Sequence, residues 1–158
     1  MRWWTAVDLR RPTFLFESWS SMQFAHFTLA YWCVLVASLL PIACAGIAKA
    51  GMFGKSRRLG GFDNENPRAW LARQTDWRAR ANAAQANSFE ALPFFIGAVI
   101  IAHQLGAHQA RLDILAFLFV VLRMMYIMMY VSGMATVRSL VWSLAFALNI
   151  AILFVGYR

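Results

Sequence analysis

The sequence predicts an all-α membrane protein folded as a four-helix up-and-down bundle, and three observations support this. Of the 158 residues, 61% are hydrophobic and only 14% are charged, whereas about a quarter of a soluble domain is charged. Two of the three connections between apolar stretches are short, which favours antiparallel neighbouring helices. Each apolar stretch approaches the roughly 20 residues that cross about 30 Å of hydrocarbon as a helix. The four predicted spans are residues 22–48, 83–103, 112–131 and 139–155.

The first predicted span follows an N-terminal segment, residues 1–21, that contains several tryptophans and phenylalanines. We expect this segment to be a tail with interfacial aromatic residues, preceding one membrane domain over residues 22–158. Asp8 and Pro12 interrupt any early apolar run, so a secretory signal peptide is not expected. Cys33 and Cys44 lie eleven residues apart in the span, about 16 Å along a helix, which excludes a disulfide between them.

The connection between the first and second spans is the longest of the three. The connection after the first span, residues 49–76, contains turn residues and then Asn66-Pro67, which predicts a short surface helix over residues 67–73. Thr75 or Asp76 is expected to cap the second spanning helix.

The net charge of +8 is concentrated near this first connection, and Arg138 adds to the same side of the membrane. The positive-inside rule therefore predicts that the first and third connections are cytoplasmic and that both termini lie outside. The basic residues near the first connection also suit anionic lipid headgroups. Nucleic acid is not an expected partner, because no basic and aromatic reader motif is present. These basic residues are Lys49, Lys55, Arg57, Arg58, Arg68, Arg73, Arg78 and Arg80.

Polar residues recur along the second predicted span on one side of the helix. At about 100° per residue, Arg80, Asn87 and Glu90 fall within an arc of about 80°. Ionisable residues inside a span usually face the bundle interior and pair there. Pro93 follows one turn later and lacks the N–H that the carbonyl of Phe89 would accept.

The third predicted span carries a matching polar stripe. Arg123, Tyr126 and Tyr130 fall within about 60° on a helix, and Arg138 follows at the start of the fourth span. The depths of Glu90 and Arg123 agree in antiparallel helices, which predicts an ion pair between them. Two interpretations stay open: a functional pocket, or a polar cluster that only fixes helix register. The histidines lack the spacing of metal ligands.

The stretch ANAAQANSFEALPFF resembles the second-helix signature of the membrane-associated proteins in eicosanoid and glutathione metabolism, the MAPEG superfamily. The shared pattern is an Asn, a Glu three residues later and a Pro three residues after that, here Asn87, Glu90 and Pro93. RMMYIMMY followed by VRSLVW resembles the superfamily's pattern at the junction of the third and fourth spans. The resemblance covers most of the chain after about residue 22, and it is closest to small bacterial members.

The resemblance implies a homotrimer in a bacterial inner membrane, with glutathione held between subunits at the cytoplasmic face. It also implies roles for seven residues. Arg138 and Tyr130 would act at the glutathione thiol, and the others would bind the remainder of glutathione or order the residues that do. These others are Arg80, Asn87, Glu90, Arg123 and Tyr126. A lipophilic small molecule entering from the lipid would be the second substrate.

One position departs from the superfamily's pattern. Catalytic members usually carry an arginine seven residues before the Glu, where this sequence has Ala83, and Arg80 is one turn earlier. The leading hypothesis is a membrane glutathione-dependent transferase or peroxidase. The alternatives are a non-catalytic binding or accessory subunit of the same fold, which Ala83 favours, and a small proton-coupled exporter that uses Glu90.

Overall fold

A computed structural model describes residues 27–157, which form an all-helical protein. Four of the helices are long and apolar enough to cross a membrane, so the predicted integral multi-pass membrane protein is confirmed. The predicted N-terminal tail lies outside the described residues. The elements in chain order are α2 (Leu29–Lys49), η1 (Arg57–Leu59), α3 (Pro67–Ala72), α4 (Asp76–Gln104), α5 (Gln109–Ser132) and α6 (Ala135–Phe154).

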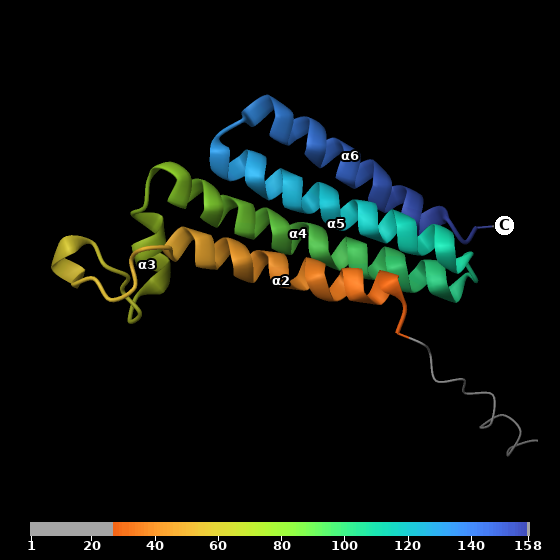
Figure 1. The fold of residues 1–158 in the computed structure, drawn as a ribbon, viewed down its shortest axis with the longest axis horizontal. Coiled ribbons are helices and arrows are strands. Elements are labelled where there is room, and N and C mark those ends of the chain that lie inside the picture. The colour runs from red at the N-terminus through yellow and green to blue at the C-terminus, as the bar shows by residue number, and fades with distance from the viewer. Residues whose placement is uncertain (1–26, 158) are drawn as a thin grey trace, which may run out of the picture.

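The four long helices run up and down side by side (Figure 1). Helices α4 and α5 each pack against all the other long helices. Helices α2 and α6 lie on opposite sides of this central pair (Figure 1). The long α2–α4 connection and the short α5–α6 turn lie at the same end of the bundle (Figure 1). We call this end the basic end, because most of the basic residues of the connection between α2 and α4 lie there.

Small side chains allow the helices to pack closely. The buried core contains alanines from every long helix and a stacked aromatic pair, Phe95 and Phe119, with ring centroids 4.1 Å apart. In lipid, where hydrophobic burial does not drive helices together, close packing of small residues supplies much of the association energy. These alanines are Ala30, Ala37, Ala98, Ala102, Ala116 and Ala145.

The connection between α2 and α4 is folded around one tryptophan. Trp70 of α3 is 3% exposed, donates its indole N–H to the carbonyl of Gly60 at 3.2 Å, and packs edge-on against Phe62. Lys49 places its ammonium 4.6 Å from the Phe62 ring centre. The predicted short helix is present as α3, with Asn66 as N-cap and Pro67 at its start.

An exposed ion pair lies on the outside of this connection. Arg57 contacts Glu65 at 2.9 Å and Asp63 at 3.5 Å. The hydrogen bond from Arg57 lowers the pKa of the Glu65 carboxyl and raises the pKa of Arg57. Both groups are solvated, so the pair adds little to stability.

Arg80 stabilises the end of α5. Gly133 follows α5 with a φ of 80°, a conformation that a glycine adopts without strain. The Nε of Arg80 donates to the carbonyl of Val131 at 2.9 Å, one of the last carbonyls of α5, which have no partner within the helix. A cation at this position also interacts favourably with the helix dipole.

At the opposite end of the bundle, Asp113 of α5 caps α2. Its Oδ1 accepts a 2.8 Å hydrogen bond from the backbone N–H of Ala30 and a 2.7 Å bond from Gln109. The N-cap residue of α2, Thr28, makes no capping bond with its own side chain. A carboxylate from a neighbouring helix therefore supplies the acceptor that the first turn of α2 requires.

Asp113→Ala is expected to lower the free energy of unfolding by about 1–2 kcal/mol, the usual cost of removing a helix cap. Asp113→Asn keeps an oxygen acceptor for Ala30 and should lose less than half as much. Thermal unfolding in detergent measures both variants. Equal stability of Asp113→Ala and the unmutated protein would show that the cap contributes nothing.

Candidate functional site

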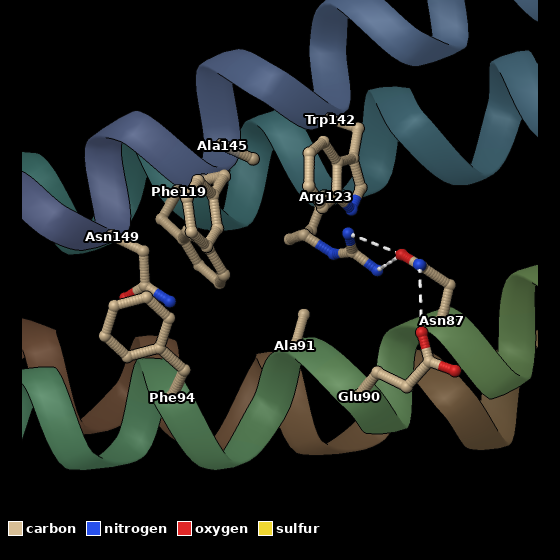
Figure 2. Close-up of a pocket in the computed structure, with 10 residues that line it drawn as sticks. Asn87, Glu90, Ala91, Phe94, Phe119, Arg123, Trp142, Ala145 and Asn149 are labelled. Atoms are coloured by element: carbon tan, nitrogen blue, oxygen red, sulfur yellow. Dashed lines mark hydrogen bonds between the residues drawn. The ribbon is translucent and has the colours of Figure 1, made fainter.

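Arg123 is the centre of a polar cluster inside the bundle. Its side chain is 3% exposed and reaches from α5 towards α4 (Figure 2). Both terminal nitrogens donate to Asn87 Oδ1 at 3.1 Å, and Nη2 also donates to Ser88 Oγ at 3.3 Å. The guanidinium carbon lies 4.5 Å from the Tyr126 ring centre. The cluster thus holds a buried positive charge through neutral partners.

Asn87 connects Arg123 to Glu90. Its Nδ2 donates to Glu90 Oε2 at 3.2 Å while its Oδ1 accepts from Arg123 (Figure 2). Among the described residues, no direct ion pair joins Glu90 to Arg123, so the predicted direct pair is wrong. The reason is that Asn87 lies one turn earlier on α4 and its amide occupies the position between the two charges. Glu90 itself is exposed and leaves its carboxylate available to a further partner.

Tyr130 and Arg138 stand one turn nearer the basic end. The Arg138 guanidinium carbon lies 4.4 Å from the centre of the Tyr130 ring, and the Tyr126 and Tyr130 rings meet edge to face at 5.5 Å. Tyr126 is buried, whereas Tyr130 and Arg138 are half-buried. A cation stacked on an aromatic face is held in place while its remaining N–H groups stay free for a ligand.

Two cavities meet at this cluster. The first, which we call the mouth cavity, measures about 420 Å³ and opens near the α5–α6 turn. The second, the inner cavity, measures about 150 Å³ and lies between α4 and α6. Asn87 and Trp142 line both, so the polar mouth cavity and the mainly apolar inner cavity adjoin at these two residues. The mouth cavity is otherwise lined by Tyr126, Tyr130, Arg138, Ser139 and Ser143.

Arg80 and Ala83 do not line either cavity. Arg80 uses its Nε on the end of α5, as described above, so one of its donors is not available to a ligand. Ala83 is half-buried, one turn before Asn87 on α4. Of the seven residues selected from the sequence, the structure therefore brings six together and gives Arg80 a structural contact.

The residues at the site that were not predicted from the sequence include Ser88, Trp142 and Asn149. Ser88 accepts from Arg123, Trp142 lines both cavities, and Asn149 is buried at the far end of the inner cavity. Asn149 carried a usable signal, because it is an amide in an otherwise apolar part of the fourth span. Ser88 and Trp142 carried none, since a serine or tryptophan in a span is unremarkable before its neighbours are known.

Both cysteines are buried and unpaired. Cys44 packs in the same apolar cluster as Tyr126 and Val141, and Cys33 packs in the main core. Neither lines the two cavities, so both serve as packing residues.

Comparison with family models decides the family. The model of the MAPEG family matches residues 29–157, which is most of the chain. The chain belongs to the MAPEG family. Comparisons with curated proteins and with solved structures found no significant match.

Family membership gives the cellular and metabolic context of this MAPEG protein as well as its fold. It is a multi-pass membrane protein of a family that acts in glutathione and eicosanoid metabolism. Of the residues that carry the family resemblance, Asn87 accepts hydrogen bonds from Arg123 and donates one to Glu90. Both residues belong to the polar cluster; Asn87 lines both cavities and Glu90 lines the inner cavity.

Proposed function

We propose that the protein is a glutathione-dependent transferase or peroxidase that acts on a lipophilic electrophile or hydroperoxide. The observation that carries this proposal is the stacking of Arg138 on Tyr130 beside a cavity that continues into an apolar one. A polar thiol substrate and an apolar partner would then meet near Trp142, which both cavities share.

The charges of the site suit glutathione, which carries two carboxylates and one ammonium group. Arg138 offers free guanidinium donors to a carboxylate or a thiolate. The exposed carboxylate of Glu90 suits the ammonium group, and Arg123 fixes Asn87 for a further hydrogen bond. A guanidinium beside a thiol favours the thiolate, which is the nucleophilic form.

The thiolate supplies the chemistry. With an electrophilic carbon, a C–S bond forms and either a leaving group departs or an added proton completes the product. With a hydroperoxide, the sulfur takes the outer O–H group to form a sulfenic acid, the O–O bond breaks, and the alkoxide becomes an alcohol on protonation. A second glutathione thiol then converts the sulfenic acid to the glutathione disulfide and water. In both cases Tyr130, which lines the mouth cavity beside Arg138, would donate a hydrogen bond to the sulfur.

We propose that the basic end faces the cytoplasm and that the protein is a homotrimer. The excess of lysine and arginine at this end supports the orientation. The open side of the mouth cavity supports the trimer, because a neighbouring subunit would close it around glutathione. Crosslinking followed by mass measurement in detergent tests the oligomeric state.

The proposal is tested first by glutathione binding to the purified protein. Glutathione at 100 times its dissociation constant should raise the free energy of unfolding by about 2.7 kcal/mol, measured by thermal unfolding in detergent. Equal concentrations of free glutamate and glycine serve as the control for charge and ionic strength. No shift at millimolar glutathione would exclude the transferase and the peroxidase.

One observation favours a second function, a non-catalytic binding or accessory subunit. Ala83 replaces an arginine expected from the family resemblance, and Arg80 contacts the end of α5. The same titration separates the two functions, because an accessory subunit would retain the fold and the apolar cavity without a glutathione-dependent shift.

Ala83→Arg is expected to raise the affinity for glutathione about tenfold, because it adds a charge-assisted hydrogen bond next to Asn87. Ala83→Lys, which lacks the planar fork, should gain less, and Ala83→Leu should gain nothing. Calorimetric titration measures all three. An unchanged affinity in Ala83→Arg would show that this turn of α4 does not face bound glutathione.

A further inference from the structure

The inner cavity ends at a buried amide that the polar cluster does not use. Asn149 of α6 is 2% exposed, and its Oδ1 has no hydrogen-bond partner among the described residues. Its neighbours at this end of the cavity include the rings of Phe94 and Phe119 (Figure 2). A buried amide oxygen without a partner is destabilising, and within a membrane span such a residue usually marks a ligand or a partner.

The position of Asn149 sets a distance along the cavity. Trp142, at the junction with the mouth cavity, lies seven residues earlier on the same helix, which is about 10 Å at 1.5 Å per residue. Between them the wall consists mainly of apolar side chains, among them Ala145, Phe146 and Ala91. The cavity therefore has a polar group at each end and an apolar wall between them.

We propose that Asn149 is a specificity-determining residue that selects a single-chain hydrocarbon carrying a hydroxyl group about 10 Å from the end at Trp142. The chain fits the apolar wall, and the hydroxyl bonds to the amide. An amide is suited to a hydroxyl, because it contains both a donor and an acceptor and its two ends exchange by a half-turn of the side chain. A plain hydrocarbon chain would leave the buried amide unpaired and would bind more weakly.

A contact with a second copy of the chain is a weaker explanation for Asn149. Its side chain is already enclosed by α4, α5 and α6 residues in one subunit, and the inner cavity is the space that it borders. A small molecule enters such a space more readily than a helix of a neighbouring subunit. The role of the hydrocarbon as a co-substrate rests on the proposed function, whereas its binding to the inner cavity does not.

The test measures binding without glutathione. Radiolabelled decanoic acid, whose carboxylate suits Arg123 near the Trp142 end of the cavity, is displaced from the purified protein in detergent by decanoic acid or by its monohydroxy forms. We expect one hydroxyl position to improve displacement about threefold to tenfold over decanoic acid. Asn149→Leu, which is similar in size but apolar, should abolish this preference.

Phe146→Leu is the matched control, because it alters the same wall without changing a polar group. It should change the affinity for all the fatty acids alike and keep the preference for the hydroxyl. Asn149→Leu should also raise the melting temperature of the empty protein, since it removes an unpaired buried amide. A residue that only holds the fold together would instead lower it when replaced.

Three results would overturn the inference: no binding of decanoic acid, no preference for any hydroxyl position, or a preference that survives Asn149→Leu. A change in oligomeric state in Asn149→Leu would assign the amide to a contact between copies and would also overturn it. A hydroxyl preference without any glutathione-induced stabilisation would support the chain site and reject the transferase. Glutathione binding without a hydroxyl preference would support the transferase and reject the hydrocarbon site at Asn149.

Discussion

Arg138→Ala is expected to remove most of the thiolate of bound glutathione at neutral pH. A neighbouring cation lowers the pKa of a thiol by one or more units from about 8.5, and each unit is a tenfold change in the equilibrium between thiol and thiolate. Arg138 is the arginine stacked on Tyr130 at the mouth cavity. Loss of its charge should therefore reduce the thiolate fraction by up to about tenfold.

The ultraviolet absorbance of the thiolate measures this effect with glutathione at saturation, so that weaker binding does not mimic it. Arg138→Lys keeps the charge and should keep part of the signal. Arg111→Ala, an exposed arginine near the start of α5, is the matched control and should keep all of it. A full signal in Arg138→Ala would remove Arg138 from the chemistry.

Arg123→Met is expected to lower the affinity for glutathione about tenfold to a hundredfold, the usual effect of losing hydrogen bonds from a charged group. The substitution removes three hydrogen bonds and leaves Asn87 without its anchor. The stability of the empty protein should change little. The variant loses the stabilisation of these hydrogen bonds. It also no longer buries a cation that lacks a direct acidic partner, and the two effects on the free energy of unfolding offset each other.

Calorimetric titration and thermal unfolding separate these two effects. Ser88→Ala removes only one of the three bonds and should weaken binding by about threefold. If Arg123→Met lost stability and bound glutathione as before, the cluster would serve only to hold the helices in register. This was one of the two interpretations that the sequence left open, and the experiment decides between them.

The membrane spans and the polar stripes could be predicted from residue pattern alone. Apolar stretches of sufficient length allow few structures other than helices across a membrane, because backbone polar groups must be satisfied within the segment. Helical periodicity predicted the two polar stripes. Asn87 and Glu90 lie about one turn apart on one face of the second span, and Arg123 and Tyr126 lie about one turn apart on one face of the third. These predictions needed only local geometry and the properties of lipid.

The direct pairing of Glu90 with Arg123 could not be settled in this way. Helix periodicity gives a face and an approximate depth, but a shift of one turn decides which side chain meets the guanidinium. In the structure, Asn87 occupies that position. Likewise, the contact of Arg80 with the end of α5 depends on how α4 and α5 are placed relative to each other. The sequence of either helix alone does not determine this placement.

The sequence by itself determined that this protein crosses a membrane as helices and carries a stripe of polar residues on two of them. Composition and spacing suffice for this, because the cost of exposing polar backbone and charge to lipid leaves few arrangements. Only the tertiary structure decided which atoms meet. Asp113 caps a helix 83 residues away in the chain, and Asn149 borders a cavity formed between α4 and α6. Such contacts arise from the packing of whole helices, and no local pattern along the chain encodes them.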